Sequence, residues 1–151
     1  MLKPTKILVP TDFSEYSDRA LKQALDIAKH YNAKVFLLHV VHGEGYFSTA
    51  DFAISTEMMQ KINNAAFARA QDSLDKQLYS FPQAKEAEVV EVVTNIRQGV
   101  PYEEILKEAK EHGIDLIVIA SLGRSGISKY LIGSVSRNVL KGATCPVLLT
   151  K

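Results

Sequence analysis

Short segments rich in β-branched residues alternate along this chain with longer segments of helical periodicity, and this alternation limits the fold more than any other feature. In the helical segments, apolar residues recur at three- and four-residue steps, as on one face of an amphipathic helix. The strand candidates are residues 6–10, 34–41, 88–97, 115–121 and 146–150. The helical patterns cover residues 20–31 and 56–80, begin again at Pro101, and return over 134–141. Strands that alternate with helices predict an α/β domain with a mainly parallel sheet.

Two of the strand candidates differ in the burial that they predict. Residues 116–120, with the sequence LIVIA, are apolar on both faces, as a central parallel strand between two helical layers should be. The candidate at 88–97 fits a lateral strand, because Glu91, Asn95 and Arg97 would share one partly solvated face. There is no internal repeat and no linker-like boundary, so we expect one open-sheet domain over residues 1–151 with helix, sheet and helix layers.

Composition excludes several classes of protein. No apolar run approaches the roughly 20 residues of a membrane span, and residues 1–6 lack a signal-peptide profile, so we expect a cytoplasmic protein without a membrane partner. Eighteen basic and 17 acidic residues give a net charge of +1, which excludes a nucleic-acid binder that works by bulk charge. The single cysteine, Cys145, excludes an internal disulfide. Because His39 and His42 would point to opposite faces of a strand, no protein-held metal is expected.

The end of the first strand carries one candidate functional residue, Asp12. In open α/β sheets, ligands bind beyond the carboxyl ends of the strands, where the strand order reverses. Asp12 could cap the next helix and form a capping box with Glu15, three residues later. It could also accept a hydrogen bond from a ligand hydroxyl or help to hold a cation beside a phosphate. The residues alone leave both readings open.

The end of the fourth strand is followed by glycine and serine. Gly123 and Gly126 permit a tight turn and a close approach of a ligand to the backbone. Gly133 and Ser134 then open a helix, whose free N–H groups and positive dipole end suit an anion such as a phosphate. The hydroxyls of Ser134 and Ser136 and the charge of Arg124 could add to such a site. Glycine at a turn and serine at a helix start are also ordinary structural choices.

Several motifs together resemble those of the universal stress protein family. They are ILVPTDFS at 7–14, LHV at 38–40, GRSG at 123–126, GSVS at 133–136 and CPVLL at 145–149. The resemblance covers essentially the whole chain. It implies a five-stranded parallel sheet with strand order 3-2-1-4-5 and helices on both sides, and a homodimer formed through the last strand, 146–150.

One branch of that family binds ATP through a pattern of glycine, two residues, glycine, nine residues, and then glycine followed by serine or threonine. Gly123, the nine residues after it, Gly133 and Ser134 match this pattern. Ala120 replaces the first glycine and narrows the approach to the strand end, and Leu122 stands where a histidine is frequent. The resemblance therefore implies ATP as the ligand, with Mg²⁺ near Asp12, or another adenine nucleotide.

The resemblance also implies which residues would contact the nucleotide. Those on the adenine and ribose side would be Pro10, Thr11, Asp12, Val40 and Val41. Those around the phosphates would be Ser121, Gly123, Arg124, Gly126, Gly133, Ser134, Val135 and Ser136.

Three functions are compatible with these residues. The first is a nucleotide-binding stress-response module in which the nucleotide is an effector and the protein is not an enzyme. The second is an interaction protein with a vestigial pocket, which would work through its dimer and residues 42–55 towards a protein partner that the sequence does not identify. The third, an enzyme of adenylyl transfer, would need a serine- and glycine-rich loop after the first strand, where this chain has Pro10, Thr11 and Asp12.

Overall fold

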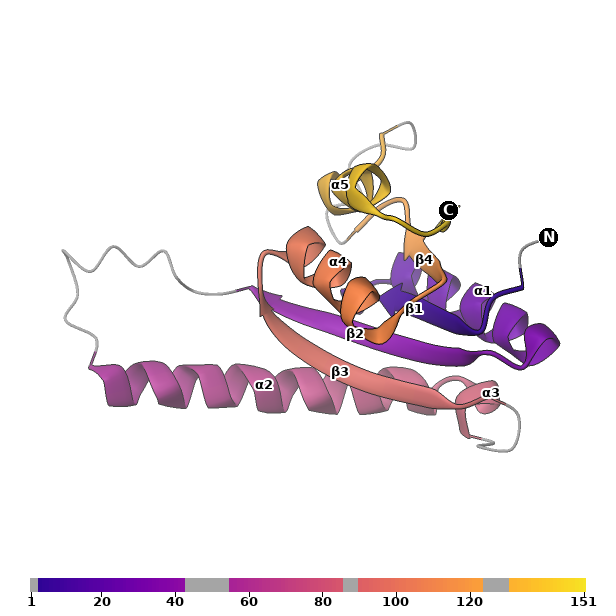
Figure 1. Ribbon diagram of the computed structural model, residues 1–151. Coiled ribbons are helices and arrows are strands. Elements are labelled where there is room, and N and C mark those ends of the chain that lie inside the picture. The colour runs from indigo at the N-terminus through magenta and orange to yellow at the C-terminus, as the bar shows by residue number, and fades with distance from the viewer. Residues whose placement is uncertain (1–2, 43–54, 86–89, 124–130) are drawn as a thin grey trace.

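The sheet has the strand order that the family resemblance implies and the parallel direction that the alternation of strands and helices predicts. The structure is a computed structural model that describes residues 3–42, 55–85, 90–123 and 131–151. Five strands form one parallel sheet in the order β3-β2-β1-β4-β5 (Figure 1). They are β1 (Lys6–Pro10), β2 (Lys34–His42), β3 (Val92–Gly99), β4 (Leu116–Ala120) and β5 (Val147–Thr150).

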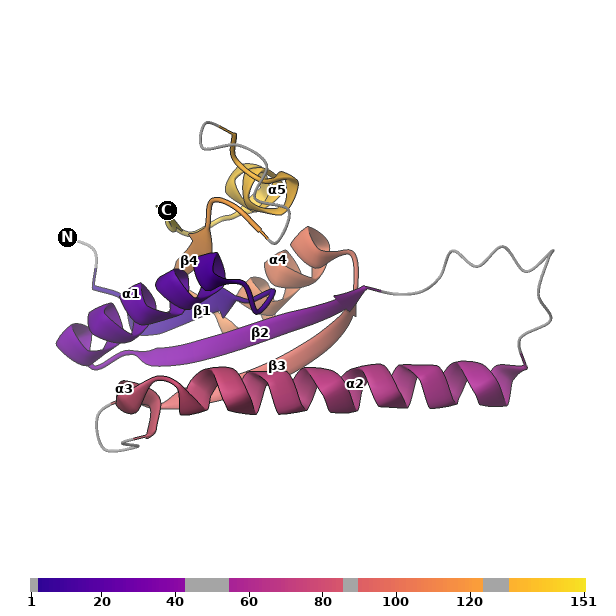
Figure 2. The same ribbon diagram turned by 180° about the vertical axis from the view of Figure 1, so that it is seen from behind.

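The helices cover both faces of the sheet. They are α1 (Glu15–Tyr31), α2 (Thr56–Tyr79), α3 (Pro82–Lys85), α4 (Pro101–His112) and α5 (Ser134–Gly142). One face packs against α1 and the C-terminal half of α2, and the other packs against α4 and α5 (Figures 1 and 2). Successive residues of a strand point to opposite faces, so Ile7 and Val9 join the first core while Leu8 joins the second. The predicted three-layer α/β architecture is confirmed.

The start of α1 differs from the predicted capping box. Ser14, and not Asp12, is the N-cap, since its hydroxyl accepts a hydrogen bond from the backbone N–H of Ser17. Asp12 accepts instead from the N–H of Ser14, at 3.0 Å. Between them Phe13 has a φ of 63°, a left-handed conformation that is unusual for a bulky residue. Asp12 therefore stands two residues before the N-cap, too far from the helix for a capping box with Glu15.

The lateral position and partly solvated face of the third strand are confirmed, but the strand starts later than predicted. β3 starts at Val92, four residues after the predicted start, and residues 88–89 lie outside the described residues. The side chains of Asn95 and Arg97 are half-buried and contact the carboxylates of α4, which the sequence did not indicate. The guanidinium of Arg97 lies 2.7 Å from Glu108 and 2.8 Å from Glu111. The hydrogen bonds that Arg97 donates to Glu111 and Glu108 raise its pKa above the ordinary value.

The carboxylates on α4 are part of the same cluster. Glu108 is fully buried and also accepts hydrogen bonds from the side-chain amide of Asn95. Glu104 accepts from Lys107 at 2.6 Å and from Arg97 at 2.9 Å, and these bonds lower its pKa. A polar cluster therefore fixes α4 against the outer strand of the sheet. The first turn of α4 lies near the carboxyl ends of the strands.

Among the described residues, no helix is long and apolar enough to cross a membrane. Within the same ranges, no group of three or more His, Cys, Asp or Glu residues could hold a metal ion. Cys145 is half-buried beside the core under α4 and α5, and burial raises the pKa of its thiol.

Candidate functional site

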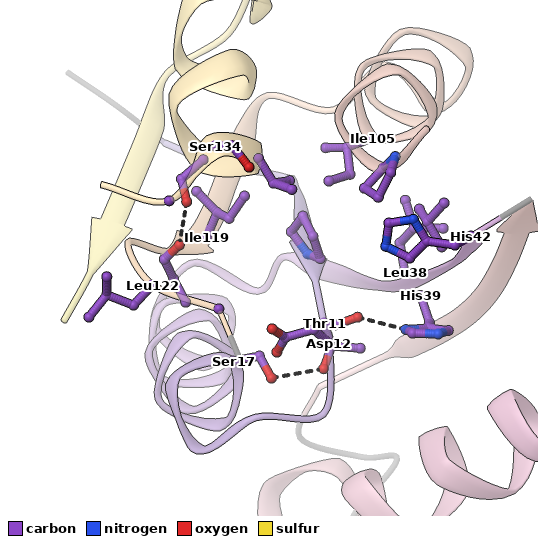
Figure 3. A pocket seen from close by; sticks show the side chains of 18 residues that line it. Thr11, Asp12, Ser17, Leu38, His39, His42, Ile105, Ile119, Leu122 and Ser134 are labelled. Atoms are coloured by element: carbon purple, nitrogen blue, oxygen red, sulfur yellow. Dashed lines mark hydrogen bonds between the residues drawn. The ribbon is translucent and has the colours of Figure 1, made fainter. Parts of the chain in front are cut away.

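A cavity of about 350 Å³ lies beyond the carboxyl ends of β1, β2 and β4 (Figure 3). The chain leaves β1 towards β2 on one side, whereas β4 pairs with β1 on the other, so the cavity stands where the strand order reverses. The first turns of α4 and α5 close its sides. The residues lining it are Pro10, Thr11, Asp12, Ser17, Leu38, His39, Val40, His42, Pro101, Ile105, Ile119, Ala120, Leu122, Gly123, Gly133, Ser134, Val135 and Ser136.

The loop after β1 forms one wall of the cavity. The hydroxyl of Thr11 lies 3.0 Å from that of Ser17 and accepts a hydrogen bond from the backbone N–H of Phe13. From β2, His39 donates its Nδ1–H to the carbonyl of Thr11, at 2.8 Å, and its ring packs on that of Phe13, at 4.4 Å. These contacts fix where Asp12 stands, at the centre of the wall.

Two glycines bring the opposite wall close to Asp12. A Cβ added to Gly123 would stand 3.0 Å from the carboxylate oxygen Oδ2 of Asp12, a contact that real Cβ atoms rarely make. A Cβ on Gly133 would stand 3.4 Å from the carbonyl oxygen of Ser121. Gly133 also donates its N–H to that carbonyl, at 2.7 Å. Without side chains at these two positions, a ligand can reach the backbone.

The N-terminus of α5 provides the anion-binding chemistry predicted from the sequence. Gly133 is its N-cap and has no side chain to bond the first turn. The first N–H groups of a helix have no intrahelical partner, so those of Ser134, Val135 and Ser136 face the cavity end of α5 with the positive end of its dipole. Among the described lining residues, the ionisable side chains are Asp12, His39 and His42.

The predicted role of the Ser136 hydroxyl is only partly compatible with the structure. Ser136 is 4% exposed and donates its hydroxyl proton to the carbonyl of Ala120, at 2.8 Å. That proton is therefore committed to the end of β4, and a phosphate at Ser136 would have to use the backbone N–H. Ser134 is exposed, so its hydroxyl is accessible from the cavity mouth.

The structure brings together most of the residues predicted for the site. Those that line the cavity are Pro10, Thr11, Asp12, Val40, Gly123, Gly133, Ser134, Val135 and Ser136. Val41 and Ser121 are not among its lining residues; Val41 follows Val40 on the strand and points to the other face of β2. Arg124 and Gly126 lie outside the described residues.

The sequence did not reveal several lining residues. The polar ones are Ser17, His39 and His42, and the apolar ones include Leu38, Ile105 and Ile119. Leu38 and His42 differ from Val40 by two positions each, so the alternation along β2 was a signal that could have placed them on its face. Pro101 and Ile105 enter from the first turns of α4, which no local motif connects with the glycines.

Comparison with known proteins shows the family and agrees with the fold. The family model described as "Universal stress protein family" matches residues 4–151. The chain belongs to this family. The universal stress protein MJ0531 of Methanocaldococcus jannaschii is 33% identical over 149 residues, covering 97% of this chain and 81% of that protein. The universal stress protein YxiE of Bacillus subtilis is 34% identical over 151 residues, and the match covers 97% of this chain and 98% of YxiE.

Solved structures of universal stress proteins have the same fold. MJ0577 of M. jannaschii superposes with a TM-score of 0.82 at 31% identity, covering 99% of this chain and 97% of that one. UspA of Lactobacillus plantarum gives 0.81 at 26% identity, with full coverage of both chains. A universal stress protein in complex with cAMP gives 0.63 at 25% identity, covering 99% and 98%. The protein from Archaeoglobus fulgidus in complex with dAMP, which is 22% identical and covers 99% and 100%, gives 0.65.

Proposed function

We propose that this universal stress protein binds an adenine nucleotide in the cavity beyond β1, β2 and β4, with ATP and Mg²⁺ as the expected form. The observation that carries the proposal is the meeting of Gly123 and Gly133 at the N-terminus of α5, which leaves backbone N–H groups accessible to a phosphate. A volume of about 350 Å³ is within the usual range for small-molecule sites. The relatives in complex with cAMP and dAMP support adenine as the base.

The arrangement of the cavity suggests how the nucleotide would lie. The phosphates would meet the first turn of α5, and the adenine would lie towards the apolar side formed by Val40, Ile105 and Ile119. Asp12 stands between these two ends, where its carboxylate could accept a ribose hydroxyl or face the Mg²⁺ ion that a triphosphate carries. Ala120 lines the cavity at the end of β4, and Gly123 keeps the space beside Asp12 free.

We infer that the nucleotide is an effector and not a substrate. Asp12 is the one carboxylate among the described lining residues, and one of its oxygens already accepts the N–H of Ser14. This engagement makes it a poor base for activating water. A nucleotide that binds one conformation more tightly than another shifts the population between them without being consumed.

The sheet also has an edge suited to the expected homodimer. β5 is a terminal strand of the described sheet, so its outer edge pairs with no other described strand. Leu148 on β5 and Leu140 on α5 are 38% and 39% exposed. We propose that two copies meet there, and that the dimer acts in the cytoplasm. Light scattering would report the mass of a dimer for the wild type and a mass nearer that of the monomer for Leu148→Glu. If the wild type and Leu148→Glu had the same mass, the proposed interface would be wrong.

The test of nucleotide binding is calorimetric titration with ATP and Mg²⁺, ADP, AMP and cAMP, with GTP as the control for base specificity. A ligand present at 100 times its Kd stabilises the folded state by about 2.7 kcal/mol. For a domain of this size, Tm should then rise by about 5–10 °C. If no adenine nucleotide shows heat of binding or a shift in Tm, the proposal is wrong.

The phosphate end is tested with Gly133→Val, which places methyl groups before the first turn of α5. The φ of Gly133, −58°, is accessible to any residue, so the change should not strain the backbone. We expect the valine side chain to keep the phosphates from the N–H groups of α5 and so to remove nucleotide binding. Thr144→Val, an exposed position beyond α5, is the control. Gly133→Ala serves if the valine variant does not fold. Unchanged affinity in a folded Gly133 variant would refute the assignment of the phosphates to α5.

A further inference from the structure

We propose that Gln77, on α2 and outside the cavity, is a positioning residue that holds the loop Thr11–Phe13 in the conformation that binds a nucleotide. This inference rests on the proposed function and deepens it. α2 contributes no residue to the lining of the cavity, so nothing in the site itself points to this helix.

Gln77 is a polar residue on the buried, otherwise apolar face of α2. The buried face of α2 consists of Ala70, Leu74 and Gln77, and Gln77 is 8% exposed. A buried amide is costly unless it is hydrogen-bonded. Its Nε2 donates to the carboxylate of Asp18 on α1, at 2.7 Å, which turns its Oε1 towards Thr11, at 3.0 Å from the hydroxyl. Both ends of the amide are therefore used at the start of α1.

The hydroxyl of Thr11 connects Gln77 with the wall of the cavity. Thr11 is 6% exposed and lies directly before Asp12. Ser17 donates its own hydroxyl proton to the carbonyl of Ser14, at 2.8 Å. The Oε1 of Gln77 can only accept, so Thr11 donates to it and uses an oxygen lone pair to accept the N–H of Phe13, at 3.1 Å. A continuous set of bonds thus runs from α2 to the backbone on either side of Asp12.

This loop needs to be held because its backbone conformation is unfavourable. Phe13, with a φ of 63°, is in the left-handed region, which L residues with bulky side chains avoid. Such conformations persist where the surrounding structure fixes them. On one side His39 bonds the carbonyl of Thr11, and on the other Gln77 bonds its hydroxyl. The N–H of Thr11 also bonds the carbonyl of Leu38, at 2.8 Å. Without Gln77, the loop loses one of these attachments, and we expect it to relax and to move Asp12 away from Gly123.

The consequence for binding follows from the population of the ligand-ready loop. The apparent Kd equals the intrinsic Kd divided by the fraction of molecules whose site is competent. If the loop is competent in nearly all wild-type molecules and in roughly a tenth to a fifth of molecules without Gln77, the apparent Kd rises about 5- to 10-fold. By linkage, a bound nucleotide must stabilise the contact between α2 and the loop by the same factor.

The experiment compares Gln77→Leu with Gln71→Leu, the same substitution at an exposed position on the same helix. Titration with ATP and Mg²⁺ well below Tm should give a Kd about 5- to 10-fold higher for Gln77→Leu and an unchanged Kd for Gln71→Leu. Hydrogen exchange supplies a second readout. Without nucleotide, the amides of Phe13 and Ser14 should exchange faster in Gln77→Leu, and saturating nucleotide should restore their protection.

A paired substitution separates positioning from general stability. Gln77→Glu combined with Asp18→Asn exchanges the two polar groups, so the amide at position 18 donates and the carboxylate at position 77 accepts from it and from Thr11. This pair should return the Kd to within about threefold of the wild-type value. If α2 only added general stability, restoring these two hydrogen bonds would not change the Kd. Gln77→Met replaces Gln77→Leu if the latter does not fold.

The outcomes distinguish this inference from the proposed function. If the wild type binds no adenine nucleotide, both fail. If the wild type binds and the Gln77→Leu or Gln77→Met protein binds equally well, the inference alone is overturned. It is also overturned if binding weakens in the single variant and the paired substitution does not recover it.

Discussion

The cluster around Arg97 allows the sharpest prediction about stability. Arg97→Met removes the guanidinium from Glu108, which is fully buried, while keeping most of the volume of the side chain. Breaking a buried ion pair from one side costs about 3–5 kcal/mol, because a charge is left without its partner. Asn95 still donates to Glu108, at 3.0 and 3.1 Å, and His112 lies 3.4 Å away. We therefore expect the lower end, about 3 kcal/mol.

The measurement is urea unfolding at pH 7, followed by thermal unfolding. A loss of about 3 kcal/mol corresponds to a fall in Tm of about 6–12 °C for a domain of this size. Arg19→Met is the matched control, since Arg19 and its partner Glu15 are 57% and 71% exposed and lie 3.9 Å apart. It should cost less than about 1 kcal/mol. Adding Glu108→Gln to Arg97→Met should recover at least half of the loss. If Arg97→Met lowers the free energy of unfolding by no more than Arg19→Met does, Arg97 does not stabilise the protein by neutralising the buried charge of Glu108.

Three smaller predictions concern other parts of the domain. The hydrogen-bonded carboxyl of Glu104 has a pKa below its ordinary value of 4.5. Its contribution to stability is therefore complete above pH 4.5 and is lost as the pH falls through the lowered pKa. In urea unfolding between pH 7 and 3, the free energy of unfolding should fall less steeply for Glu104→Gln than for the wild type. Gly113 ends α4 with a φ of 62°, so Gly113→Ala should lose about 1 kcal/mol, seen as a lower urea midpoint with an unchanged slope. Ser136→Ala removes the hydrogen bond to Ala120 and should cost about 1–2 kcal/mol, and a loss below the error of the same urea measurement would show that this bond does not hold α5.

The sequence predicted the fold well because its signals are local. β1 has the bounds that its β-branched run indicates, and α2 ends one residue before the predicted limit. The errors lie where a distant element decides. The partly solvated face of β3 was predicted correctly, but nothing near Asn95 and Arg97 shows that carboxylates of α4 will be their partners. The short α3 has too few residues for a helical period to be seen.

The site was predictable where one short motif supplies several residues, as from Gly123 to Ser136, and at Asp12 directly after a strand. Ile105 was not, because it joins the cavity through the packing of α4 and carries no motif of its own. His39 stands in the LHV motif at 38–40, but that motif does not show that its ring bonds the loop after β1. The role of Ser136 was misjudged for a related reason. A hydroxyl in a helix start can bond a ligand or a neighbouring strand end, and only the position of Ala120 decides between them.

The central position of β1 has a consequence for how the domain folds. β1 is made first, but one of its two neighbours is β4, and Thr5 beside it bonds to Asp115, 110 residues further along. Pairings over such distances make folding slow, because a long loop must close before they form. A chain still being synthesised therefore exposes one edge of β1 until β4 has been made. Since the cavity needs both strands, a nucleotide can stabilise only the last stage of folding and cannot help to start it.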